Sequence, residues 1–165
     1  MQTARLDLEP LSADHAQEAV TVLDDARLHT WTGGEPASLQ ELEARYRRQA
    51  SGQSPDGTRG WLNWILRKMP DGQLVGTVQA TLCRSATGQL EAEVAWVVGH
   101  GYQGRGYGRE GALAMAAWLR ARGVESLAAH IHPENKASIG IAQALGLIPT
   151  STMVDGEVRW SDSGG

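Results

Sequence analysis

The order of apolar and polar residues predicts a strand and two helices in the first third of the chain. Residues 3–8 alternate in the manner of a half-buried strand. A capped helix with one apolar face is expected over about 12–28, followed by a loop over 28–37. A second capped helix is expected over 38–50. The stretch 51–60 holds Gly, Ser, Pro and Asp, so it predicts a flexible connector.

The middle of the chain predicts an antiparallel sheet. Residues 61–69 and 73–83 are rich in β-forming side chains and flank a Pro-Asp-Gly turn at 70–72. A further turn leads into a third strand at 89–98. The three strands follow one another through short turns, so neighbours should pair as hairpins.

The last third alternates helices with strands. A helix is expected over 106–122, a strand over 126–132, and a further helix beginning near Asn135. An Asp-Gly pair at 155–156 predicts a two-residue hairpin close to the C-terminus. Because a helix joins strand 89–98 to strand 126–132, these two strands should run parallel.

The most distinctive motif is a glycine-rich turn that opens the helix 106–122 and consists of Gln103, Gly104, Arg105, Gly106, Tyr107 and Gly108. Glycine adopts backbone angles closed to other residues and lets a ligand approach the main chain. The helix N-terminus adds unpaired N–H groups and the positive end of its dipole, with Arg105 and Arg109 alongside. The motif therefore predicts a site for an anion such as a phosphate.

Residues 106–111 also match the G-x-G-x-x-G pattern of dinucleotide-binding folds. That interpretation requires a parallel βαβ unit and an acidic residue about 20 positions further on for the ribose. Here the motif follows antiparallel hairpins, and neither Glu125 nor Glu134 sits convincingly at the end of the next strand. A dinucleotide-dependent oxidoreductase is therefore the less favoured alternative.

Two motifs together resemble the acetyl-CoA-dependent N-acetyltransferases of the GNAT superfamily. With its leading Gln103, the glycine-rich turn is similar to the Q/R-x-x-G-x-G/A signature. Asn135, Ser138 and the Gly-Leu pair at 146–147 resemble the N-x-x-S…L-G-F element of the RimJ/RimL-like branch, with leucine in place of phenylalanine. The two motifs cover about residues 91–150 in the order and spacing of that family.

The resemblance implies an α/β (α+β) fold, with a mixed, mostly antiparallel twisted sheet of about seven strands and about four flanking helices. In that family the two central strands, here 89–98 and 126–132, splay apart, and pantetheine enters the gap as a pseudo-strand. The implied co-substrate is acetyl-CoA, and no metal is implied. The residues that the resemblance assigns to CoA are Val97 and Val98 through their main chain, Gln103, Gly104, Arg105, Gly106, Tyr107, Gly108, Arg109, Asn135 and Ser138.

Acyl transfer to an amine requires a deprotonated nitrogen, because its lone pair attacks the thioester carbonyl. A simple alkyl amine has a pKa of ~10.4, so little of it is neutral at pH 7. A carboxylate, often acting through water, relieves this. Glu91 and Glu93 face the same side of one strand, and Glu93 lies ten positions before Gln103, close to the strand glutamate of catalytic relatives. Glu93 is the first candidate base and Glu91 the second; the alternative is a surface carboxylate or a structural ion pair.

The departing CoA thiolate benefits from a proton or a hydrogen bond. Many relatives place a tyrosine seven positions after the asparagine, but that position is Ala142 here. Ser138 is the remaining candidate donor, although a serine in a first helical turn is also a common cap. Asn135 is likewise a pantetheine ligand, a helix cap, or both.

The acceptor should lie near the loop 28–37 and the connector 51–60, which flank the acceptor side in the resembling family. Trp31 and His29, together with Glu93, are the predicted acceptor-binding residues. We therefore expect an N-acyltransferase that moves acetyl to a primary amine, either a protein N-terminus or a small molecule, by direct attack in a ternary complex. The alternative is a non-catalytic module that binds or senses acyl-CoA.

The length and composition of the chain limit its domain number, its partners and its metal sites. The length of 165 residues predicts one domain over 1–165, with about 161–165 as a loose tail. A net charge of −4 without a Lys/Arg cluster argues against nucleic acid as a partner, and no apolar run is long enough to span a membrane. The single cysteine excludes an internal disulfide, and His100, His130 and His132 complete no recognisable metal site. These features predict a cytoplasmic enzyme without metal or membrane, compatible with a homodimer.

Overall fold

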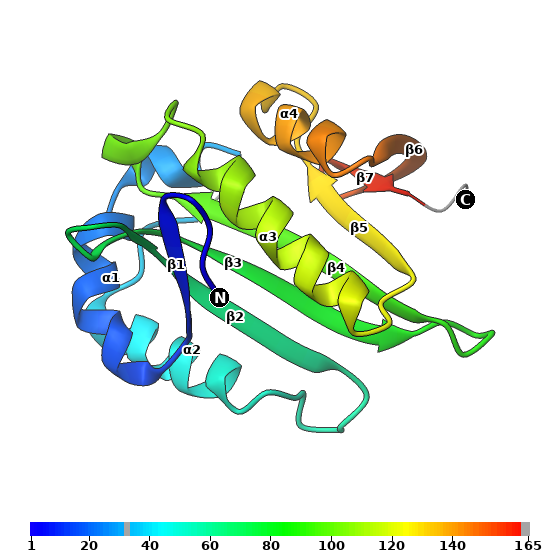
Figure 1. Ribbon diagram of the computed structural model, residues 1–165, viewed down its shortest axis with the longest axis horizontal. Coiled ribbons are helices and arrows are strands. Elements are labelled where there is room, and N and C mark those ends of the chain that lie inside the picture. The colour runs from blue at the N-terminus through cyan, green and yellow to red at the C-terminus, as the bar shows by residue number, and fades with distance from the viewer. Residues whose placement is uncertain (32–33, 163–165) are drawn as a thin grey trace.

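The computed structural model describes residues 1–31 and 34–162. Within these ranges the strands and helices follow the predicted order, as Figure 1 shows. The strands are β1 (Leu6–Pro10), β2 (Gly60–Lys68), β3 (Gln73–Arg84), β4 (Leu90–Val98), β5 (Ser126–Ile131), β6 (Ile148–Val154) and β7 (Glu157–Ser161). The helices are α1 (Ala16–Leu23), α2 (Leu39–Ala50), α3 (Tyr107–Ala121) and α4 (Lys136–Ala144), with short 3-10 turns η1 (Ala13–His15), η2 (Ala26–His29) and η3 (His100–Tyr102).

The seven described strands form one mixed sheet in the order β1-β2-β3-β4-β5-β7-β6. Neighbouring strands are antiparallel except β4 and β5, which run parallel because α3 carries the chain across between them. In the described chain, β4 and β5 pair only from Glu91 to Glu93, whereas β5 continues to pair with β7 as far as Ile131. The two central strands therefore separate beyond Glu93, and the predicted fold class is confirmed.

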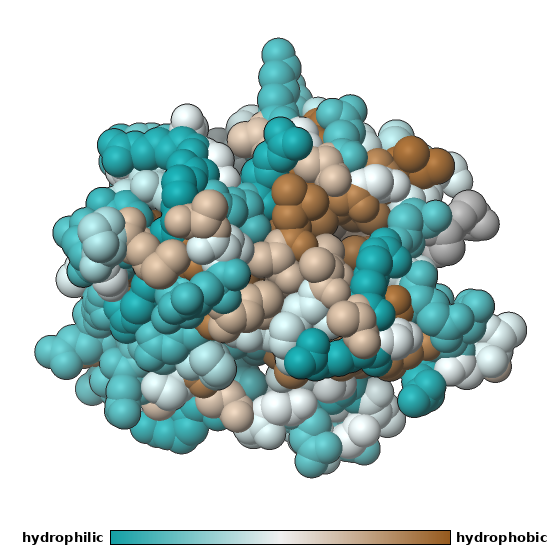
Figure 2. All heavy atoms as spheres, viewed as in Figure 1, coloured by the Kyte–Doolittle hydropathy of each residue, from teal (hydrophilic) through white to brown (hydrophobic). Residues whose placement is uncertain are grey.

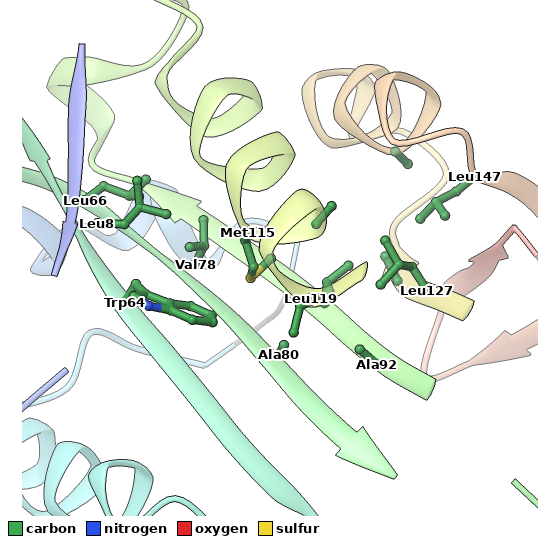
Figure 3. Close-up of a cluster of buried hydrophobic side chains, with 14 of the residues drawn as sticks. Leu8, Trp64, Leu66, Val78, Ala80, Ala92, Met115, Leu119, Leu127 and Leu147 are labelled. Atoms are coloured by element: carbon green, nitrogen blue, oxygen red, sulfur yellow. The ribbon is translucent and has the colours of Figure 1, made fainter. Parts of the chain in front are cut away.

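Helices cover both faces of the sheet. On one face, Met115 and Leu119 of α3 lie among side chains of the central strands (Figure 3) and are almost completely buried. On the other face, Leu42 and Tyr46 of α2 pack with α1 against Ile65 of β2. Figure 2 shows apolar side chains gathered near the middle of the first face, with hydrophilic ones around them.

α3 fixes the position of the glycine-rich turn relative to the sheet. Ala112, Met115 and Leu119 recur with helical spacing, and all three are buried. Gly111 allows a close approach, because a Cβ added there would lie 2.9 Å from Cδ2 of Leu66 on β2. The helix is thereby held tightly on the sheet, with its N-terminus beside the end of β4.

The helix predicted over 12–28 is wrong in its extent. α1 ends at Leu23, and η2 follows as a separate turn. Asp25 begins this turn as its N-cap, because its carboxylate accepts a hydrogen bond from Arg27 N at 2.9 Å. The residues after Asp25 therefore leave the axis of α1.

The start of the predicted loose tail 161–165 differs from the prediction, whereas 163–165 lie outside the described residues. Ser161, expected at the start of a loose tail, ends β7, pairs with Ala128 and is 1% exposed. Asp162 follows it and accepts a hydrogen bond from the main chain of β5. In the connector 51–60, the Asp56 carboxylate accepts hydrogen bonds from the Ser54 hydroxyl and from the main chain and hydroxyl of Thr58. None of the described helices combines the length and the apolar character needed to cross a membrane.

Candidate active site

A groove of about 770 Å³ opens where β4 and β5 separate. It is lined by β4 from Glu93 to Val98, the end of β5, the start of α4, the glycine-rich turn and the chain around η2. The predicted site residues in its lining are Trp31, Glu93, Val97, Val98, Gln103, Gly104, Gly106, Tyr107, Gly108, Arg109, Asn135 and Ser138. The predicted residues Glu91, Arg105 and His29 are described by the structure but lie outside this lining. The groove therefore unites the two sequence motifs with one of the two candidate glutamates.

The main chain of β4 offers hydrogen-bonding groups to the gap at every second residue. A hydrogen bond from Gly99 N to Val75 O, 2.8 Å long, continues the β3–β4 ladder. Antiparallel ladders exchange hydrogen bonds at alternate pairs, so the main chain of Val97 is bound to β3, whereas that of Trp96 and Val98 points toward β5. The main chain that faces the gap is therefore that of Trp96 and Val98, whereas the sequence analysis expected that of Val97 and Val98. Val97 contributes its side chain, which is 41% exposed.

The glycine-rich turn has the geometry of an anion cradle. Gly104 and Gly106 have φ values of 77° and 84°, in the left-handed region that favours glycine. A Cβ added at Gly104 would meet no described atom within 4 Å, so the turn faces open space. Gly106 is the N-cap of α3, whose first N–H groups have no partner within the helix. Gln103 Nε2 donates to Val98 O at 3.0 Å and ties the turn to the end of β4.

An ion pair that the sequence analysis missed supports this turn. Arg5 donates from Nη1 to the carbonyl O of Arg105 at 2.8 Å and from Nε to Glu110 at 2.7 Å. Its guanidinium also lies 4.7 Å from the centroid of the Tyr107 ring. Burial alone would raise the pKa of Glu110, but hydrogen bonds from Thr3 and Arg5 lower it below its ordinary value, so the carboxylate stays charged. Arg105 thus serves the turn through its carbonyl, while its side chain is outside the groove.

Glu93 has a partner in the groove that was not predicted. Its Oε1 lies 3.1 Å from Nδ1 of His130 on β5. The contact crosses the opening between the strands, because His130 lies two residues beyond Ala128, the last residue of β5 that pairs with β4. The exposed fractions of the two side chains are 54% for Glu93 and 24% for His130. With the proton on Nδ1, the ring donates to the carboxylate and keeps a lone pair on Nε2, so the pair can accept and pass on a proton.

The structure shows which of Asn135 and Ser138 caps α4. Asn135 is the N-cap of α4, because its Oδ1 accepts a hydrogen bond from Ser138 N at 3.2 Å. The Ser138 hydroxyl is therefore not the cap, and its Oγ accepts from Trp96 Nε1 at 3.2 Å. Since an indole N–H can only donate, the hydroxyl keeps its own proton for another acceptor. Ala142, at the position of the family tyrosine, is fully buried.

The Trp31 ring reaches the chain just beyond β5. Its centroid lies 4.9 Å from that of His132, with the planes tilted by 39°. Arg27 also lines the groove, but its side chain hydrogen-bonds to Asp25 and holds the pKa of that carboxyl well below its usual range. Trp31 is 37% exposed and remains accessible to a ligand. Gly33, in the same predicted loop, lies outside the described residues.

A second space of about 240 Å³, here called the inner hollow, adjoins the groove under α1 and α2. The two spaces share Leu28, Thr77, Gln79 and Val97. His29, a predicted acceptor residue, lines the inner hollow. The apolar side chains in the rest of its lining include Leu11, Val20, Leu23, Ala37, Leu42 and Tyr46. The two acceptor residues predicted from the loop thus lie in adjoining spaces rather than in one.

Residues 5–148 match the family model described as the acetyltransferase (GNAT) domain. The chain belongs to the GNAT acetyltransferase family. The match covers well over half of the chain and includes the glycine-rich turn, the separated ends of β4 and β5, and α4. A search of curated proteins gives no significant sequence match.

Solved structures share the GNAT fold at low sequence identity. An acetyltransferase from Thermus thermophilus is 22% identical, with a TM-score of 0.74 and coverage of 98% of each chain. An acetyltransferase (GNAT family) from Bacillus anthracis is 12% identical, with a TM-score of 0.74 and coverage of 98% of this chain and 95% of that one. AAC(6')-Ib, solved in complex with paromomycin and acetyl-CoA, is 16% identical, with a TM-score of 0.77 and coverage of 96% and 93%. At these identities the comparison establishes the fold.

The groove of this GNAT chain suits acetyl-CoA, the co-substrate of the family. A gap with free main-chain groups on β4 suits an extended pantetheine arm, and the cradle at Gly104 and Gly106 suits a pyrophosphate. Among the described residues, no group of three or more His, Cys, Asp or Glu side chains is placed to hold a metal ion.

Proposed function

We propose that this GNAT protein is an N-acyltransferase that moves acetyl from acetyl-CoA to a primary amine by direct attack in a ternary complex. The observation that carries the proposal is the meeting of the Glu93–His130 pair and the Ser138 hydroxyl in one groove with the glycine-rich turn. The attacking amine must lose a proton, and the departing sulfur must gain a hydrogen bond. Residues suited to both tasks line the same space.

The placement of CoA follows from the groups that the groove presents. The pyrophosphate would lie on the turn 103–108, where the start of α3 and Arg109 attract negative charge. The pantetheine arm would pair with the main chain of Trp96 and the N–H of Val98, since the Val98 carbonyl already accepts from Gln103. This placement would direct the thioester along β4 toward Glu93 and Ser138.

The bond changes assign a task to each side chain. Acetyl-CoA supplies an activated carbonyl carbon, to which the amine nitrogen bonds as the carbon–sulfur bond breaks. The ammonium nitrogen first gives up one proton to the Glu93–His130 pair, directly or through water. It gives up a second proton to solvent as the amide forms. Ser138 donates its hydroxyl proton in a hydrogen bond to the departing sulfur, while Trp96 holds the Ser138 oxygen in place. The sulfur leaves as a thiolate that solvent can protonate.

Finer assignments draw on the sequence as well. The order and spacing of Asn135, Ser138 and Gly146 support a place in the RimJ/RimL-like branch, which includes ribosomal-protein N-terminal acetyltransferases. A free Cys83 and dependence on acetyl-CoA support a cytoplasmic location. The homodimer stays a prediction.

A panel of acyl-CoAs, amines and N-terminal peptides tests the proposed function. We expect free CoA to appear only when acetyl-CoA and an amine are both present, and mass spectrometry to find one acetyl group on the amine. Reactions without protein or without amine provide the controls. Tight CoA binding without any amine-dependent release would contradict the proposal and support an acyl-CoA sensor instead.

Trp31→Ala should weaken use of the acceptor while leaving CoA affinity nearly intact. The Trp31 ring lines the groove near η2, on a different segment from the turn that would hold CoA. Loss of an aromatic contact predicts a rise of about 2- to 10-fold in KM for the amine. Steady-state kinetics and calorimetry with CoA measure the two effects separately.

The control for this change is His132→Ala, which removes the ring partner of Trp31 but no residue of the groove lining. A smaller effect on KM is expected for it. If Trp31→Ala lowers CoA affinity as strongly as acceptor use, the loop has a structural role and the acceptor side is assigned wrongly.

A further inference from the structure

The inner hollow is a space over the centre of the sheet that the described helices do not fill. Its floor includes Thr77 and Gln79 of β3 and Val97 of β4, and its other walls come largely from the chain of α1, η2 and α2. Val97 is 41% exposed although β4 is the central strand of the sheet. A large apolar side chain in such a place is normally covered. The helices thus leave about 240 Å³ open above it.

The lining of the hollow is mainly apolar. Leu42 and Tyr46 of α2 are 3% and 4% exposed, and Val20 of α1 packs against the same cluster. Burial raises the pKa of Tyr46 to about 12, so its ring stays neutral. Apolar atoms make up most of the exposed lining, although seven polar or charged residues also contribute to it: Asp24, His29, Arg45, Gln49, Asn63, Thr77 and Gln79. Such a lining favours an alkyl or aryl group over a charged or highly hydroxylated one, which would lose its hydration.

The volume of the hollow and its distance from Glu93 limit which substituents can bind in it. An apolar cavity of roughly 150 Å³ accommodates benzene, so this hollow has room for a ring or a branched alkyl group with part of its chain. The hollow meets the groove at Val97, which lies four residues from Glu93 on the same face of β4. That separation is about 13 Å for an extended strand. A substituent on an amine held near Glu93 must therefore extend along β4 to reach the hollow, which requires an alkyl chain of several methylenes.

We propose that the inner hollow binds the apolar substituent of the acceptor, and that the acceptor is a small primary amine carrying a phenyl or branched alkyl group on an alkyl chain of several methylenes. This inference rests on the proposed function. It assigns acceptor selection to the space between α1, α2 and the sheet, with Val97 as the side chain that both spaces share.

Filling the hollow provides the test. The probes are n-propylamine and phenylalkylamines with two to five methylenes, studied by kinetics with acetyl-CoA and by calorimetry with CoA present. For the wild-type protein we expect kcat/KM to be about 10- to 100-fold higher for the best phenylalkylamine than for n-propylamine. Ala37→Phe places a ring in the hollow and should abolish this preference by lowering kcat/KM for the phenylalkylamine. Leu113→Phe adds the same ring on α3, at a residue that lies outside both linings, and should keep the preference.

A second filled variant, Val20→Phe, enters from α1, and CoA affinity reports whether each variant is folded. A phenylalkylamine could bind the wild-type protein, fail to bind both filled variants and never be acetylated. That outcome would support binding in the inner hollow and contradict the proposed function. Equal kcat/KM for propyl and phenylalkyl amines would overturn the inference while leaving acyl transfer intact. Unchanged phenylalkylamine affinity in the folded, filled variants, or a preference for an aminoglycoside or for peptides with polar first residues, would also overturn it.

Discussion

Glu93→Gln is expected to lower turnover by a factor of about 10²–10⁴, the usual range for loss of a general base. Glutamine keeps the shape of the side chain and an oxygen that can accept from His130, but it removes the charge that receives the proton. CoA affinity should be unchanged, because CoA would be held by the turn 103–108 and by main-chain groups of β4. The loss should shrink at high pH, where solvent already deprotonates the amine. A pH profile of kcat measured for both proteins shows whether that recovery occurs.

Glu91→Gln is the matched control, since Glu91 lies two residues earlier on the same face of β4 but outside the groove lining. It should retain full activity. His130→Asn should also lower turnover. The double variant with Glu93→Gln should lose less turnover than the product of the two single losses, because the pair acts as a unit. If Glu91→Gln loses activity while Glu93→Gln keeps it, the assignment of the base is wrong.

Gly106→Val should weaken CoA binding by more than about tenfold, or ~1.4 kcal/mol. The φ of Gly106 is 84°, and a β-branched residue rarely adopts that conformation. A Cβ there would also lie 3.2 Å from Arg5 Nη2, so the ion pair that supports the turn would have to shift. Valine would further crowd the approach of a pyrophosphate to the N-terminus of α3. Calorimetry with CoA measures the loss.

Gly123→Val separates the effect on binding from the effect on folding. Gly123 follows the other end of α3, with a φ of 93°, and an added Cβ would meet no described atom within 4 Å. Both variants should lose roughly 1–2 kcal/mol of stability from the left-handed backbone. Only Gly106→Val should lose CoA affinity. Unchanged affinity in a folded Gly106→Val protein would contradict the cradle assignment.

The elements that the sequence predicted well are those with a strong local signal. Strands β2, β3 and β4 are bounded by turn residues, and the glycine-rich turn carries its own backbone requirement. The helix at 12–28 was extended too far because its apolar spacing continues past Leu23. The helix does not continue there, because the Asp25 side chain caps the separate turn η2. The two adjacent aspartates at 24–25 are the sequence feature that indicates this break.

The contacts between distant strands could not be predicted in the same way. The Glu93–His130 contact joins residues 37 positions apart, and it depends on how α3 sets the register of β5 against β4. The Arg5–Glu110 pair joins residues 105 positions apart. The choice between Trp96 and Val97 as the residue with free main-chain groups depends on which β3–β4 pairs exchange hydrogen bonds. Side-chain alternation in the sequence carries no information on that choice.

The separation of β4 and β5 gives the protein a sheet edge in its interior. The main chain of Trp96 and the N–H of Val98 face this edge, and edges of this kind are where proteins capture strands from other chains. A bound pantetheine arm would occupy that edge and stabilise the folded state by about 2.7 kcal/mol at a concentration 100 times its Kd. The free energy of unfolding would then increase with the concentration of the acyl donor. The acyl donor would therefore affect the lifetime of the folded protein as well as its rate of turnover.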